Sequence, residues 1–167
     1  MTPAELLSDS LERVRESVHE VLDGLSAEDL THRPTPDANP IGWLVWHLTR
    51  VQDDHVADVA GTEQVWTADG FVGRFDLPYD TTAHGYGQSS EEVGQLRVDA
   101  ELLAAYYDAV HRRTLEYVAG LDPDDLDRVV DKRWDPPVTL GARLVSVVND
   151  DTQHVGQAAY ARGLLGR

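Results

Sequence analysis

The sequence predicts an all-α protein, a four-helix bundle with a long connection between the second and third helices. Four long segments carry apolar residues at the spacings of three and four that are typical of amphipathic helices. No segment shows a convincing strand pattern. A short motif also occurs twice, after the first and after the third long segment, which indicates two related helical hairpins.

Length and composition predict a single domain, residues 1–167, with a core of ordinary size. The formal net charge is −16, and no cluster of Lys and Arg is present, so nucleic acid and anionic membranes are poor partners. No membrane span or secretory signal is visible, and we expect a cytoplasmic protein. Lys132 is the one lysine beside many Arg, Ala, Val and Asp, a bias typical of GC-rich bacterial genomes.

The first helix is expected from about Pro3 to Asp23. Thr2 and Pro3 supply a start signal and Gly24 a stop signal. His19 lies off the apolar face among charged neighbours, so we expect it to be solvated. The apolar face of this helix consists of Leu7, Leu11, Val14, Val18, Val21 and Leu25.

A capped turn at residues 26–30 and a proline-rich connection precede the second helix. Asn39 is the expected N-cap, with Pro40 in the first helical turn. The helix then runs from Ile41 to about Ala60, and Gly61 ends it.

Residues 62–89 show no period, and a stretch this long inside a compact domain is usually functional or disordered. Its aromatic residues favour packing over disorder. We expect either a lid or pocket wall, which would use Arg74 and the segment Trp66 to Tyr86, or a loop that merely covers one end of the core.

The third helix is expected to start at Ser89 or Ser90 and to keep its apolar spacing from Val93 to Tyr117, with His111 at the edge of the apolar face. Residues 120–126, GLDPDDL, then echo residues 24–30, GLSAEDL. Each copy follows a long helix and precedes a proline-rich connection and another helix. The last helix is expected over Leu140 to Leu164.

Three polar residues interrupt the apolar face of this last helix: Asp150, Asp151 and His154. A buried charge is costly unless it is paired or bound to a metal. His47 lies in an equally apolar part of the second helix. We therefore predict that the two helices meet around a metal ion. Taken separately, His47 has a simpler interpretation as a hydrogen-bonded core histidine, and Asp150 with His154 as a pair on one helix face.

Helix geometry alone does not choose the carboxylate, because Asp150 and Asp151 lie four and three residues before His154. Cysteine is absent, which leaves nitrogen and oxygen as metal ligands and requires any thiol to come from outside the chain. Two imidazoles and one carboxylate leave a coordination position open for water or substrate.

Two motifs carry a resemblance to a known family. Residues 39–48 read NPIGWLVWHL and residues 150–157 read DDTQHVGQ. These motifs resemble the DinB-like (damage-inducible) superfamily, and more narrowly its actinobacterial branch of mycothiol-dependent enzymes. The resemblance extends over nearly the whole chain. The resemblance implies a divalent metal held by His47, Asp150 and His154. Histidine is usual at the position of Asp150, although the isomerase branch has a carboxylate there.

The resemblance implies a metal-dependent S-transferase that activates mycothiol for attack on an electrophile. Zinc is the expected metal, with nickel or manganese as alternatives, and a homodimer is a family-level expectation. Two other functions stay open: a mycothiol-dependent isomerase of the maleylpyruvate type, and a non-catalytic metal-binding stress protein. Gln157, Asn149 and Asp151 are candidates for orienting the ligands, while His55, His84 and His111 are expected to be structural.

Overall fold

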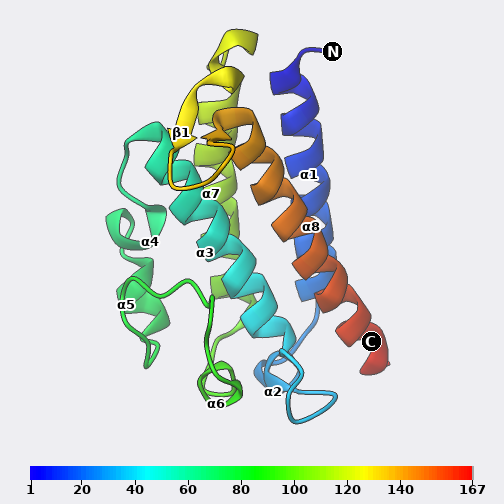
Figure 1. Cartoon of the computed structure of the whole chain (residues 1–167). Coiled ribbons are helices and arrows are strands. Elements are labelled where there is room, and N and C mark those ends of the chain that lie inside the picture. The colour runs from blue at the N-terminus through cyan, green and yellow to red at the C-terminus, as the bar shows by residue number, and fades with distance from the viewer. Residues whose placement is uncertain (167) are drawn as a thin grey trace.

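Four long helices form the bundle in the computed structural model, which describes residues 1–166 (Figure 1). This confirms the all-α fold class. The elements in chain order are α1 (Pro3–Leu22), α2 (Ala27–Thr31), α3 (Ile41–Ala60), α4 (Val65–Ala68), α5 (Phe71–Phe75), α6 (Ser90–Val93), α7 (Ala100–Ala119), η1 (Pro123–Asp127), β1 (Val129–Asp131), β2 (Val138–Thr139) and α8 (Leu140–Leu164).

The helices α1 and α3 run in opposite directions, as do α7 and α8 (Figure 1). The two hairpins are joined by the long connection, which crosses from the end of α3 to the start of α7 and carries α4, α5 and α6. As the repeated motif predicts, a short capped turn follows the first helix of each hairpin. Ser26 begins α2 and Asp122 begins η1, each with a capping box.

Apolar residues of the four long helices meet in the centre of the bundle. The expected face of α1 is buried from Leu11 to Leu25, and only Leu7 is partly exposed. On the other side of α3, the connection buries Trp66, Phe71 and Phe75. The rings of Trp46 and Trp66 meet edge to face at 6.5 Å, which joins the connection to α3.

Two expected helix starts are wrong. Pro40, not Asn39, is the N-cap of α3, and no side chain caps that helix. Ser89 caps only the short α6, and α7 begins after Asp99, whose side chain accepts from the backbone N–H of Leu102. Val93 and Leu96 are buried as their spacing predicts, but they belong to a short helix and a linker rather than to α7.

Three smaller expectations also need correction. A two-stranded antiparallel sheet, β1 with β2, lies before α8 where no strand was expected. His19 is not simply solvated, because its Nε2 lies 2.8 Å from Oδ1 of Asp108. His111 is buried, and its Nε2 lies 2.8 Å from Oε2 of Glu12. Among residues 1–166, no helix is long and apolar enough to cross a membrane.

Candidate metal centre

Three side chains that could hold a metal ion converge where α3 and α8 pack together, and we call them the ligand group: His47 from α3 with Asp150 and His154 from α8. One potential ligand atom from each residue lies within 4.8 Å of the other two. The rings of His47 and His154 have centroids 4.7 Å apart. Because Asp150 and His154 are one helical turn apart, they project from the same face of α8 toward α3.

Asp151 is not part of the ligand group. Its side chain is fully buried, and neither carboxylate oxygen has a hydrogen-bond partner among residues 1–166. Burial raises its pKa well above the usual value, and the charge of Asp150 adds to this effect. The structure therefore brings Asp150, and not Asp151, to the two histidines.

The connection fixes the ring of His47. Its Nδ1 contacts the backbone oxygen of His84, and because a carbonyl oxygen can only accept, Nδ1 must carry the proton. The lone pair of the neutral ring is then on Nε2, the arrangement that suits a metal ligand. The ring also stacks on Trp43 at 4.7 Å, and the Trp43 indole donates to Gln88 Oε1 at 2.7 Å. Burial lowers the pKa of His47, which favours this neutral form.

The donor atoms fit a divalent cation. Oδ2 of Asp150 and Nδ1 of His154 are buried without a hydrogen-bond partner among the described residues. Buried polar atoms without a partner are rare in proteins, so such atoms next to a second histidine call for an explanation. Two imidazoles and one carboxylate suit zinc and related divalent ions, and three protein ligands leave a position open.

A buried polar network holds the connection against α3. Arg50 donates from Nε to the carbonyl of Ala83 at 3.1 Å and from Nη1 to Oε1 of Gln64 at 2.8 Å. Asp53 accepts from the backbone N–H groups of Val65 and Trp66, both at 2.8 Å. Burial raises the pKa of Asp53, although these hydrogen bonds oppose that effect. Arg50 thus fixes the residue immediately before His84, whose carbonyl holds His47.

A pocket of about 260 Å³ opens beside the ligand group. We call it the histidine pocket, because three of its lining residues are histidines. His47 and Asp150 form one part of its wall, and Tyr86 is 88% exposed at its edge. The lining residues are His47, Val51, Asp54, His55, His84, Tyr86 and Asp150.

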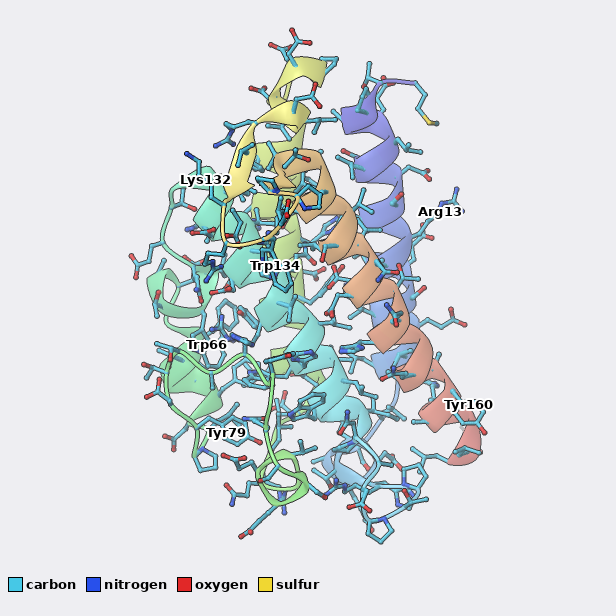
Figure 2. All side chains as sticks on the ribbon, in the orientation of Figure 1. Arg13, Trp66, Tyr79, Lys132, Trp134 and Tyr160 are labelled. Carbon is cyan, nitrogen blue, oxygen red and sulfur yellow. The ribbon has the colours of Figure 1, made fainter. Side chains whose placement is uncertain are left out.

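The expected pocket wall is only partly correct. His84 and Tyr86 line the histidine pocket, whereas Arg74 is exposed and stacks over Phe71, with Cζ 4.5 Å from the ring centroid. Trp66 and Tyr79 lie on the side of α3 away from α8 (Figure 2). Both line a different pocket, with Trp46, of about 170 Å³.

The candidates for orienting the ligands are not seen in that role. Asn149 and Gln157 are exposed, and Gln157 lines a groove at the C-terminal end of α8 instead. Instead, the backbone carbonyl of His84 orients the ring of His47. Sequence reasoning also missed the place of His55 in the pocket. Its position two helical turns beyond His47 was the available signal, since that spacing returns to a similar face of α3.

Comparisons with known proteins identify the family and the fold. A family model described as mycothiol-S-transferase matches residues 6–166. Among solved structures, a crystal structure of a conserved protein from Enterococcus faecalis superposes with a TM-score of 0.94 at 30% identity, covering 100% of this chain and 99% of that one. A search of curated proteins gave no match.

Proposed function

The chain belongs to the mycothiol S-transferase family, and from this premise we propose that it is a divalent-metal-dependent enzyme. In this proposal His47, Asp150 and His154 hold the metal, and the thiol of mycothiol attacks an electrophile in the histidine pocket. The observation that carries the proposal is the convergence of the three potential ligand atoms within 4.8 Å, at the wall of a pocket.

A bound divalent ion supplies Lewis acidity that lowers the pKa of a thiol at its open position. The chain has no cysteine, so the sulfur nucleophile must belong to a small-molecule thiol. The residues of the protein orient the reactants. His47 is fixed in one tautomer by the His84 carbonyl, and Trp43 holds the plane of its ring.

The size of the pocket limits what it can enclose. Its volume of about 260 Å³ is below the range of roughly 300–1,000 Å³ usual for sites that bury a drug-sized ligand. We therefore propose that it takes only the reacting ends of the thiol and the electrophile. The remainder of each molecule would lie on the surface beside the exposed ring of Tyr86.

The family match favours transfer over the two other functions. The matched family is described as mycothiol-S-transferase. A transferase consumes its thiol, whereas an isomerase returns it. A purely metal-binding role would not require an open pocket next to the ligand group, yet the group forms part of a pocket wall.

The test compares zinc-loaded, nickel-loaded, manganese-loaded and metal-free protein in the conjugation of mycothiol to monochlorobimane. We expect a rate that depends on metal, one thiol consumed per product, and loss of both metal and rate in His154→Ala. His32→Ala, which changes an exposed histidine outside the pocket, is the control and should behave as the wild type.

Metal bound at one equivalent without any metal-dependent conjugation would favour the non-catalytic function. Recycling of mycothiol with isomerisation of maleylpyruvate would favour the isomerase. Wild-type protein that binds no divalent metal after reconstitution would overturn the ligand group itself.

A further inference from the structure

The histidine pocket contains a third imidazole that the proposed function does not use. His55 follows His47 on α3 by two helical turns and lines the same pocket as His47 and Asp150. Its side chain is 32% exposed, so the ring is accessible from the pocket without being fully solvated.

The ring nitrogens of His55 are not engaged by hydrogen bonds among residues 1–166. The carboxylate of Asp54 is the ion-pairing neighbour, and its Oδ2 is 3.9 Å from Nδ1, beyond hydrogen-bond distance. Asp54 is itself engaged elsewhere, because its Oδ1 accepts from Nε2 of Gln64 at 2.8 Å. His55 can therefore accept a proton without breaking a hydrogen bond of the fold.

The other polar groups of the pocket are less suited to this task. His47 and Asp150 are assigned to the metal in the proposed function. The ring Nδ1 of His84 faces the backbone N–H of Tyr86 at 3.4 Å, and its carbonyl holds His47. His55 is the remaining imidazole of the pocket.

We propose that His55 is the general base of the transfer reaction, accepting the thiol proton as the sulfur attacks the electrophile. This inference rests on the proposed function and names one further residue of its site. The thiol S–H bond breaks and its proton moves to a ring nitrogen of His55. The sulfur electron pair forms the new C–S bond, and the leaving group departs with the electrons of its bond to carbon. His55 then releases the proton to solvent.

The surroundings of His55 keep the imidazole neutral. Burial lowers its pKa, and the positive charge of Arg143 on α8 acts in the same direction. Asp54 raises it, His84 lowers it and Asp150 raises it, each with a smaller effect. With a pKa below its usual value of 6.5, His55 is an unprotonated acceptor at neutral pH.

The test uses zinc-loaded full-length protein with mycothiol and monochlorobimane, over a range of pH. General base catalysis accelerates reactions by about 10²–10⁴-fold. A thiol whose pKa the metal already lowers needs less help from a base, so the lower end of this range applies. We therefore expect His55→Ala to lower kcat/KM by about 100-fold near neutral pH. The deficit should shrink as pH rises and the thiol ionises by itself. Zinc content should match that of the wild type.

Added imidazole separates a proton acceptor from a structural residue. It should restore much of the rate of His55→Ala, whereas it should not change His32→Gln, the control at an exposed histidine. His55→Gln with the wild-type rate at every pH, or a His55→Ala deficit that imidazole leaves unchanged, would overturn the proposal. If the wild type itself shows no metal-dependent conjugation, the failure is that of the proposed function, and the assay distinguishes the two.

Discussion

The backbone carbonyl of His84 accepts a hydrogen bond from Nδ1 of His47, so a residue of the long connection sets the tautomer of a candidate metal ligand on α3. The same connection is anchored by Arg50, which binds the carbonyl of Ala83. Backbone partners of this kind orient a ligand ring and raise its basicity. The connection between the two hairpins is therefore part of the candidate metal centre.

Gly85 allows the connection to approach His47 this closely. A Cβ at this position would lie 2.6 Å from Nδ1 of His47 and 2.9 Å from Cζ2 of Trp43, and the residue has φ +98°. We expect Gly85→Ala to lower metal affinity by about 10–100-fold, the loss usual when the support of a ligand is disturbed. Competition with a chromogenic chelator measures this affinity.

The matched control for Gly85 is Gly87→Ala. Gly87 also has a positive φ, +78°, but nothing lies within 4 Å of the Cβ that would be added. The positive φ alone should cost each variant about 1–2 kcal/mol of unfolding free energy, and the close contacts of the added Cβ should make the loss larger in Gly85→Ala. Equal metal affinities in the two variants would show that contact with His47 is unimportant.

Arg50 is fully buried and supports the connection through side-chain hydrogen bonds and its position over the Trp66 ring, 5.0 Å from the centroid. A lysine cannot reproduce the directions of these hydrogen bonds or the stacking over Trp66, because it lacks the planar guanidinium. Arg50→Lys should therefore lower the unfolding free energy by about 3 kcal/mol, as expected when a buried charge loses its partners. Urea unfolding measures the change.

Arg113→Lys is the control for Arg50. Arg113 also binds the connection, at the Glu63 carbonyl and the Asp69 carboxylate, but its side chain is 41% exposed. An exposed pair contributes at most about 1 kcal/mol, so the two substitutions should differ clearly. A similar small loss in both would mean that the Arg50 network does not hold the connection in place.

Helical periodicity predicted the elements that carry the candidate ligands, and missed what surrounds them. The last helix has the expected bounds, Leu140–Leu164, because its apolar positions keep the helical spacing along its whole length. Asp150 and His154 are partly buried at the edge of that apolar face. The start of α7 was misplaced because Val93 and Leu96 keep the helical spacing across a real break. A backbone carbonyl such as that of His84 has no sequence signature. Its role depends on how a connection without a period folds back on α3.

His111 should make the fold sensitive to acid. Burial lowers its pKa below the usual 6.5, although its contact with Glu12 opposes this. Below about pH 6.5 the unfolded chain therefore binds more protons at this position than the folded chain. The unfolding free energy should then decrease as the pH is lowered. His111→Gln in metal-free protein should reduce that slope by at most about 1.4 kcal/mol per pH unit. Urea unfolding at several pH values measures the slope, and an unchanged slope relative to His32→Gln would contradict the assignment.

Asp150 and Asp151 are adjacent in sequence, yet the same substitution should lower metal affinity strongly at Asp150 and hardly at Asp151. Asp150→Asn removes the carboxylate from the ligand group, and we expect metal affinity to fall by at least about 100-fold, since an amide oxygen is a weaker ligand for zinc. Asp151 lies fully buried, and burial raises its pKa well above the usual value, which favours a neutral acid close in shape to asparagine. Asp151→Asn should therefore keep metal affinity within about 3-fold, because that carboxyl group is not a ligand. Isothermal titration with zinc measures both constants, and strong loss in Asp151→Asn alone would assign the ligand to Asp151.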